Sequence, residues 1–148
     1  MDETQLQVFI DGTIHYFSQA SGEPADVGTP YLISDDQTVA DEYTGIIGIS
    51  GKRRGTVYFT AGPGLLKVLL MSLGETDLSH EFLCDLVGEV ANTISGNARR
   101  CFGADFMISV PLVVKGQPER IHSPKNLRSF VIPISWRSHE AALVITVE

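Results

Sequence analysis

Three polar residues, Asp85, Glu89 and Asn92, recur at intervals of four and three positions in a stretch whose apolar residues follow a helical pattern. At about 100° per residue, an α-helix places all three on one face. Two carboxylates one turn apart repel each other modestly unless a cation is presented to them from outside. A carboxamide can both donate and accept hydrogen bonds. This face therefore has the character of a surface that a partner covers.

Two glycines, Gly88 and Gly96, lie on or beside the same face. Inside a helix, glycine costs about 1 kcal/mol relative to alanine, so its presence needs a reason. Glycines leave room for a close approach, and we therefore expect Gly88 and Gly96 to contact a partner. The alternative is an ordinary solvated helix face.

The helix that would carry these residues extends from about Asp77 to Phe102. Thr76, Asp77 or Ser79 can cap its start, and Gly103 follows its end. Its opposite side is apolar at the spacing of an amphipathic helix packed on a core. The residues on that side are Leu83, Val87, Val90, Ile94, Ala98 and Cys101.

Other kinds of catalytic site find little support. The glycines between residues 45 and 51 form no phosphate-binding P-loop, because Ile46 and Arg53 stand where that motif needs glycine and serine or threonine. No Gly-x-Ser-x-Gly elbow is present. Only His80 lies at helical spacing from a cysteine, Cys84, and two further metal ligands are missing, so we expect His80 to face solvent. The histidines are scattered, at His15, His80, His122 and His139.

Composition narrows the class of protein. With 148 residues and 43% hydrophobic residues, the chain suits one globular domain spanning residues 1–148. The net charge of −7 and the pI near 5.0 argue against nucleic acid as a partner. No apolar run of about 18 residues and no signal peptide is found, which predicts a cytoplasmic protein without membrane insertion. Cys84 and Cys101 lie roughly 25 Å apart at about 1.5 Å per helical residue, so we expect both to be reduced and buried.

The remaining pattern predicts an α+β domain with an antiparallel sheet and helices packed on it. Residues 3–19 have two interpretations: apolar residues recur at helical spacing, whereas Asp11-Gly12 is a hairpin signal. We favour the helix, and we predict a second, short helix at residues 64–73. Strands are predicted at residues 31–33, 43–50, 55–60, 106–114, 130–136 and 141–147, with a loop at 115–125.

The motif Asp85-x-x-x-Glu89-x-x-Asn92, followed by Pro111, resembles the signature of the CheC/CheX/FliY chemotaxis phosphatases. The family pattern is Asp or Ser, three residues, Glu, two residues, Asn, and a proline further on. The stretch from Thr44 to Gly51 also looks like the hairpin of that family. A single copy of the motif is similar to CheX, since CheC-type chains usually carry two. The interval from Asn92 to Pro111 is shorter here than in the family pattern.

The resemblance implies that the substrate is the phospho-aspartate of a CheY-like response regulator in chemotaxis signalling. Because the receiver domain itself holds Mg²⁺ on the phosphoryl group, the phosphatase needs no cofactor or metal of its own. Asn92 is then expected to position the attacking water, and Glu89 to bind the active-site lysine of the receiver. Asp85 is assigned a supporting role. CheX-like proteins are typically dimers, so a homodimer is expected, with the C-terminal antiparallel hairpin as a candidate interface.

Two other functions stay open. The same helix could dock on a receiver and only sense or sequester it, or the chain could be a structural dimer subunit, such as a motor or adaptor component. The carboxamide of Asn92 favours catalysis over docking alone. Loss of phosphate from a phosphorylated receiver distinguishes the enzyme from the other two.

Overall fold

An antiparallel sheet organises the structure, which is a computed structural model that describes residues 1–116 and 127–148. Its strands are β1 (Asp26–Val27), β2 (Tyr31–Ile33), β3 (Tyr43–Gly51), β4 (Gly55–Ala61), β5 (Phe106–Ile108), β6 (Leu112–Lys115), β7 (Ser129–Trp136) and β8 (His139–Val147). They lie in the order β1–β7–β8–β4–β3–β5, with β2 also paired to β7 and β6 also paired to β3. Each edge of the sheet is therefore built from two short strands.

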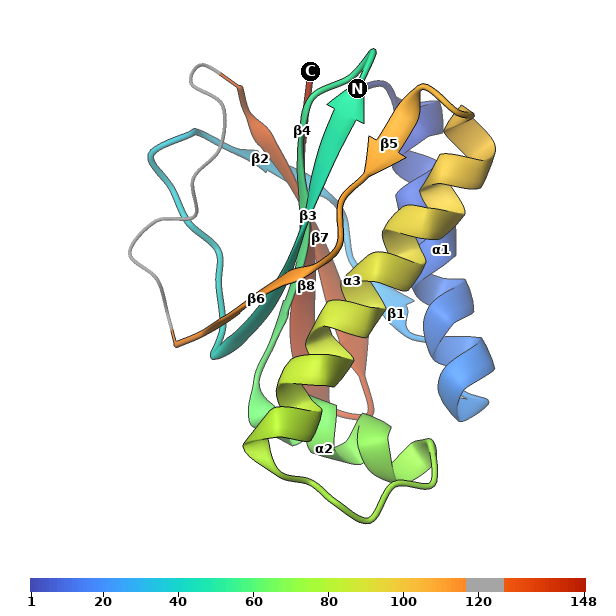
Figure 1. Ribbon diagram of the computed structural model, residues 1–148, viewed down its shortest axis with the longest axis vertical. Coiled ribbons are helices and arrows are strands. Elements are labelled where there is room, and N and C mark those ends of the chain that lie inside the picture. The colour runs from blue at the N-terminus through green and yellow to red at the C-terminus, as the bar shows by residue number, and fades with distance from the viewer. Residues whose placement is uncertain (117–126) are drawn as a thin grey trace.

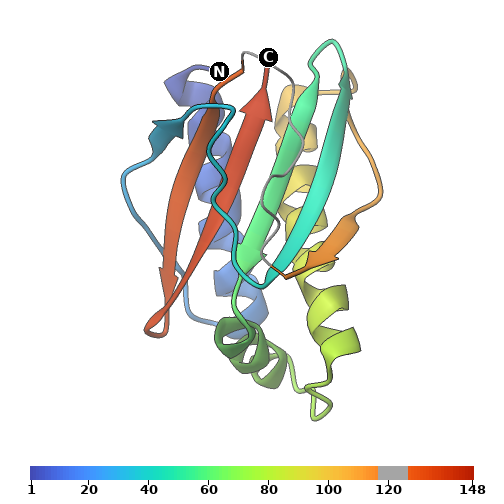
Figure 2. The ribbon, with the colours of Figure 1, turned by 90° about the vertical axis from the view of Figure 1, so that its left-hand side faces the viewer.

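Helices α1 (Glu3–Ser21), α2 (Pro63–Ser72) and α3 (His80–Phe102) accompany the sheet. In Figure 1, α1 and α3 lie on the same face of the sheet, and α2 lies near the start of α3. Figure 2 shows the opposite face, which no described helix covers and which the coil between β2 and β3 crosses. The predicted α+β fold is thus confirmed. None of the described helices is long and apolar enough to cross a membrane.

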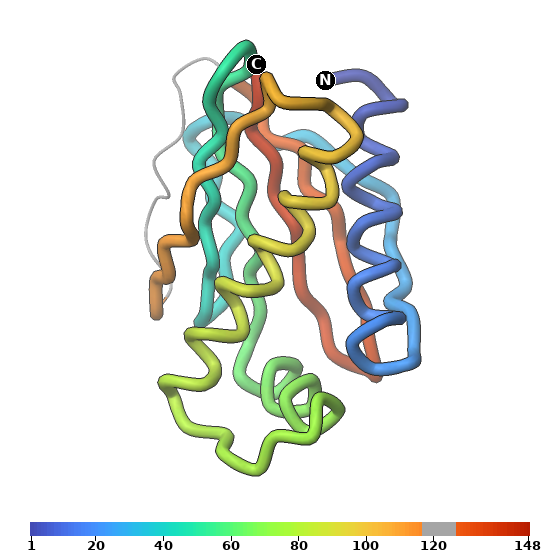
Figure 3. Tube along the Cα trace, turned by 45° about the vertical axis from the view of Figure 1, so that its right-hand side comes forward, coloured from blue at the N-terminus to red at the C-terminus, as the bar shows by residue number. Residues whose placement is uncertain are grey.

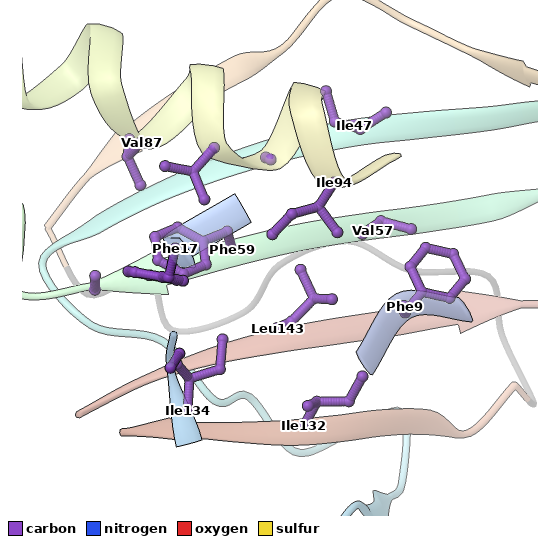
Figure 4. Packing of buried hydrophobic residues seen from close by; sticks show 14 of the residues in the cluster. Phe9, Phe17, Ile47, Val57, Phe59, Val87, Ile94, Ile132, Ile134 and Leu143 are labelled. Carbon is purple, nitrogen blue, oxygen red and sulfur yellow. The ribbon is translucent and has the colours of Figure 1, made fainter. Parts of the chain in front are cut away.

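The main core lies between the sheet and the two long helices (Figure 4). Phe9 and Phe17 enter it from α1, and Val87 and Ile94 enter it from α3. Burying each such side chain contributes about 1.5–3 kcal/mol, so the core determines which side of α3 must face inward. The strand residues that meet them include Ile47, Val57, Phe59, Ile132, Ile134 and Leu143.

The first helix settles the choice left open by the sequence. Residues 3–21 form α1, so the helical interpretation is right and the hairpin is wrong. Asp2 and Gln5 form a capping box: the Gln5 amide donates to Asp2 Oδ1 at 2.8 Å, and the Asp2 amide donates to Gln5 Oε1 at 3.1 Å. Gly22, with φ of 79°, provides the left-handed residue that ends the helix.

Two strand predictions need correction. The strand expected at residues 106–114 is divided, because β5 and β6 pair separately with β3 and residues 109–111 lie between them. The C-terminal hairpin of β7 and β8 has no free edge, since β8 also pairs with β4 and β7 with β1 and β2. The prediction that this hairpin forms a dimer interface through an unpaired edge is therefore wrong. His122 and most of the predicted loop at 115–125 lie outside the described residues.

Candidate functional site

Helix α3 carries the predicted site, and its inward side is largely as expected. Cys101, however, is exposed, because the last inward position is taken by Phe102, whose ring packs 5.0 Å from that of Phe106. Counting four residues at a time from Ile94 reaches Ala98 and then Phe102, so the buried stripe continues to Phe102. The other five residues expected on the inward side are each at most 2% exposed: Leu83, Val87, Val90, Ile94 and Ala98. The buried side of α3 is wider than the predicted stripe, since it also includes Leu86, Gly88, Ala91 and Ser95.

Asp85, Glu89 and Asn92 all lie on the outward side of α3 and are exposed. Among the described residues, no hydrogen bond or ion pair holds any of these three side chains. Within the described part of the chain, their polar atoms therefore have no protein partner and face solvent. Such side chains can meet a partner without first breaking an internal contact.

Glu89 borders two grooves. On one side lies a groove between α1 and α3, which Glu89 lines together with Tyr16 and Thr93. On the other side lies a groove between the end of α2 and α3, which Glu89 lines together with Asp85 and Leu70. Asp85 and Glu89 thus share one groove, whereas Asn92 lines neither.

Tyr16 is a neighbour of Glu89 that the sequence did not reveal. Burial, and to a smaller extent the negative charge of Glu89, raise the pKa of Tyr16 well above the ordinary value for a phenol. The hydroxyl is therefore neutral at physiological pH and remains a hydrogen-bond donor near the carboxylate. No spacing in the sequence relates the two residues, because only the packing of α1 on α3 brings them together.

Gly88 does not face a partner, and that prediction is wrong. It is buried, and a Cβ on it would lie 3.1 Å from Val113 Cγ2 and 3.4 Å from Pro111 Cβ. Gly45 of β3 lies beneath it: a Cβ on Gly45 would clash with the Val87 carbonyl oxygen and lie 2.9 Å from Gly88 Cα. The two glycines therefore allow α3 and the sheet to approach backbone to backbone at the site.

Gly96 differs from Gly88. It is partly exposed, and apart from the adjoining residues of α3 no described residue places a heavy atom within 4 Å of the position a Cβ would take. The space beside it is open, so contact between Gly96 and a partner stays a prediction. Pro111 lies against α3 at Gly88, the residue that precedes Glu89. It takes this place although fewer residues separate it from Asn92 than in the family pattern.

The start of α3 is attached to β3 through His80. Its Nδ1 lies 3.0 Å from Tyr43 Oη, and its Nε2 lies 3.5 Å from Cys84 Sγ. His80 is exposed as expected but is not free, because the tyrosine fixes its ring. Burial raises the pKa of the Cys84 thiol, and the Asp85 charge adds to this effect. Across residues 1–116 and 127–148, no three or more histidine, cysteine or acidic residues gather as metal ligands.

Comparison with known proteins gives one family and a set of similar folds. The family described as chemotaxis phosphatase CheX matches residues 43–135. A search of curated proteins gives no match. A CheC-like superfamily protein from Shewanella sp. PV-4 is 24% identical with a TM-score of 0.85, covering 100% of this chain and 99% of that chain. The chemotaxis protein CheX of Vibrio vulnificus is 25% identical with a TM-score of 0.83, covering 98% and 99%.

A third similar structure contains a partner. It is the complex of CheX with CheY, BeF₃ and Mg²⁺ from Borrelia burgdorferi, at 18% identity and a TM-score of 0.76, covering 97% of both chains. This likeness concerns the fold alone. The match over residues 43–135 includes all of α3 together with β3 and Pro111, the elements that build the site. The chain belongs to the CheX family of chemotaxis phosphatases.

Proposed function

We propose that this protein removes the phosphoryl group from the phospho-aspartate of a CheY-like receiver domain. The observation that carries the proposal is the presence of Glu89 and Asn92 one turn apart on the outward side of α3, both exposed and neither engaged by another described residue. Membership of the CheX family and the similarity to a CheX solved in complex with CheY support it further.

Asn92 is the residue to which we assign the chemistry. Hydrolysis of an acyl phosphate requires a water molecule in line with the bond that breaks, and the receiver's own Mg²⁺ offsets the charge of the phosphoryl oxygens. The Asn92 carboxamide can accept a hydrogen bond from this water and donate another to the phosphoryl group without itself changing protonation. Water oxygen bonds to phosphorus, the aspartate carboxylate leaves, and the protons of the water end on inorganic phosphate.

Glu89 provides the anchor in this proposal. Its carboxylate is one turn before Asn92 and would form a charge-assisted hydrogen bond with the receiver's active-site lysine. Asp85 shares a groove with Glu89 and would add negative charge beside the same cation. Both acidic residues therefore act on binding, whereas Asn92 acts on the chemical step.

The test measures loss of phosphate from the organism's phosphorylated CheY-type receivers, tried one by one. We expect Asn92→Ala to lower the maximal rate about 100-fold or more, as for removal of one group that orients a reacting atom. Glu89→Ala should raise the receiver concentration for half-maximal rate about tenfold. The matched control is Glu81→Ala, which removes an exposed carboxylate from the first turn of α3. A wild type that does not accelerate hydrolysis, or an Asn92→Ala variant of undiminished rate, would refute the proposal.

A docking module without catalysis is the second candidate function. It is favoured if the wild type binds the phosphorylated receiver but leaves its lifetime unchanged. The homodimer also stays a proposal, although the C-terminal hairpin cannot supply its interface by strand pairing. Size-exclusion chromatography with light scattering decides the oligomeric state.

A further inference from the structure

The two most exposed of the large hydrophobic side chains in the described chain stand on either side of Pro111. Val110 is 84% exposed and Leu112 is 63% exposed. With Pro111 they lie where the chain passes from β5 to β6, and we name Val110, Pro111 and Leu112, the last of which is the first residue of β6, the apolar knuckle. Two exposed aliphatic side chains in three residues make an apolar projection that water does not favour.

The apolar knuckle is held rigidly. Ser109 Oγ accepts a hydrogen bond from the Gly48 amide at 2.8 Å and donates one to the Val110 carbonyl at 2.9 Å. The Ser109 amide donates to the Gly48 carbonyl at 3.0 Å. Strand β5 precedes the knuckle and β6 begins within it, at Leu112, and both strands pair with β3. The exposure of Val110 and Leu112 is therefore built into the fold.

The apolar knuckle also lies directly beside the proposed site. Pro111 lies under the position a Gly88 Cβ would occupy, at 3.4 Å, and Gly88 is one residue before Glu89 and one turn before Asn92. Figure 3 shows α3 between α1 on one side and the β5–β6 stretch on the other. A protein that covers Asn92 must therefore come close to the apolar knuckle, which lies against α3 one helical turn away.

We propose that the apolar knuckle is a second docking contact for the receiver domain, taking an apolar patch at the rim of its phosphorylation site. This inference rests on the proposed function. We choose the receiver domain as the partner because the knuckle adjoins the surface of Glu89 and Asn92, on which the receiver is proposed to bind. A second copy of the chain fits less well. The edge here is interrupted, with β5 and β6 only three and four residues long and Pro111 lacking an N–H between them, so it is poorly suited to pairing with another strand.

Steady-state dephosphorylation of a phosphorylated CheY-type receiver from the same organism separates docking from chemistry. The double variant Val110→Ser, Leu112→Ser should raise KM about tenfold or more while kcat stays within about twofold, because apolar area buried on binding is lost. The matched control is Leu32→Ser, which removes a 47% exposed leucine from β2 at the opposite edge. Its KM should equal that of the wild type, and thermal unfolding checks that each variant is folded.

The result that overturns the inference is a double variant with unchanged KM, or one whose kcat alone falls. It is equally overturned if light scattering shows that the double variant only changes the oligomeric state. Binding to the receiver loaded with BeF₃ and Mg²⁺, measured by calorimetry, separates this failure from failure of the proposed function. A wild type that binds the BeF₃-loaded receiver but does not accelerate hydrolysis of the phosphorylated receiver fails as an enzyme. The affinity of the double variant for the BeF₃-loaded receiver, about tenfold weaker or unchanged, still decides the docking contact.

Discussion

The two flanks of α3 are built in different ways. On the β3 and β6 side, Gly45 and Gly88 bring helix and sheet together without side chains between them, and Pro111 closes over Gly88. On the α1 side, a groove separates the two helices, and Tyr16, Glu89 and Thr93 are among the residues that line it. At Gly45 the first flank is strand backbone against helix backbone, whereas on the second flank side chains from both helices line the space between them.

This difference assigns separate tasks to the flanks. Backbone contacts cannot change rotamer, so the sheet flank determines the height of α3 and hence how far Asn92 projects. Side chains in a groove can adjust, so the α1 flank influences the direction of the Glu89 carboxylate. We therefore expect substitutions at the buried contact of helix and sheet, at Gly45 and Gly88, to alter stability and the chemical step. Substitutions in the groove on the α1 flank should alter binding, as should those in the exposed apolar knuckle, which lies outside the buried contact.

The largest effect is expected for Gly45→Ala. The new Cβ would clash with the Val87 carbonyl oxygen and lie 2.9 Å from Gly88 Cα, and neither backbone can yield without moving α3. Overpacking of this kind costs about 1–3 kcal/mol, so urea unfolding should show a loss of about 2 kcal/mol or more. Gly48→Ala on the same strand is the control, because its nearest neighbour would be Ser109 Oγ at 3.4 Å. Equal stability of the two variants would contradict a rigid sheet flank.

A smaller and more selective effect is expected for Gly88→Ala compared with Gly96→Ala. Alanine gains about 1 kcal/mol over glycine inside a helix, and at Gly96 the space beside it is open. The Gly96 variant should therefore be more stable by about that amount, and weaker receiver binding would support close approach of a partner there. At Gly88 the Cβ would lie 3.1 Å from Val113 Cγ2, which offsets the gain and shifts Pro111.

Stability and kcat together test this pair. The Gly88→Ala protein should have near wild-type stability but a severalfold lower kcat, because α3 is displaced at Asn92. If Gly88→Ala stabilises the protein as much as Gly96→Ala and leaves kcat unchanged, the two flanks do not differ as described.

Much of the fold could be predicted because the residues that become buried recur at regular spacing within each helix or strand. The apolar stripe of α3 gave both its buried side and, by difference, the outward position of Asp85, Glu89 and Asn92. The strands of the β3–β4 and β7–β8 pairs followed from apolar runs separated by turn residues. In each case the prediction depends only on the spacing of apolar residues within one helix or strand, which shows which of them share a face.

The predictions that failed depend on contacts between distant segments. Gly88 lies at the border of the polar face, and only the position of β6 decides that it is covered by the protein's own Pro111. The C-terminal hairpin has no free edge because β1, β2 and β4 join it from far along the chain. Tyr16 reaches Glu89 only through helix packing. Periodicity within one element contains no information about such partners.

The smallest effect is expected for Tyr16→Phe, which tests the α1 flank. Removing a neutral hydroxyl near Glu89 should raise the KM for the phosphorylated receiver about two- to fivefold and leave kcat unchanged. Since burial and the Glu89 charge raise the pKa of Tyr16, its ionisation plays no part near neutral pH, and the ratio of the two KM values should be the same from about pH 6 to 9.

Alkaline unfolding provides an independent measurement on the same pair of proteins. Above the ordinary phenol pKa of about 10, the unfolded chain loses the Tyr16 proton while the folded chain keeps it, so stability falls as pH rises. Tyr16→Phe removes this contribution, and its unfolding free energy should fall less steeply than that of the wild type above about pH 10. Tyr58, whose pKa burial raises to about 12, contributes equally to both proteins and cancels in the comparison. A Tyr16→Phe protein with lowered kcat would show that the α1 flank also acts on the chemical step, and the division between the flanks would fail.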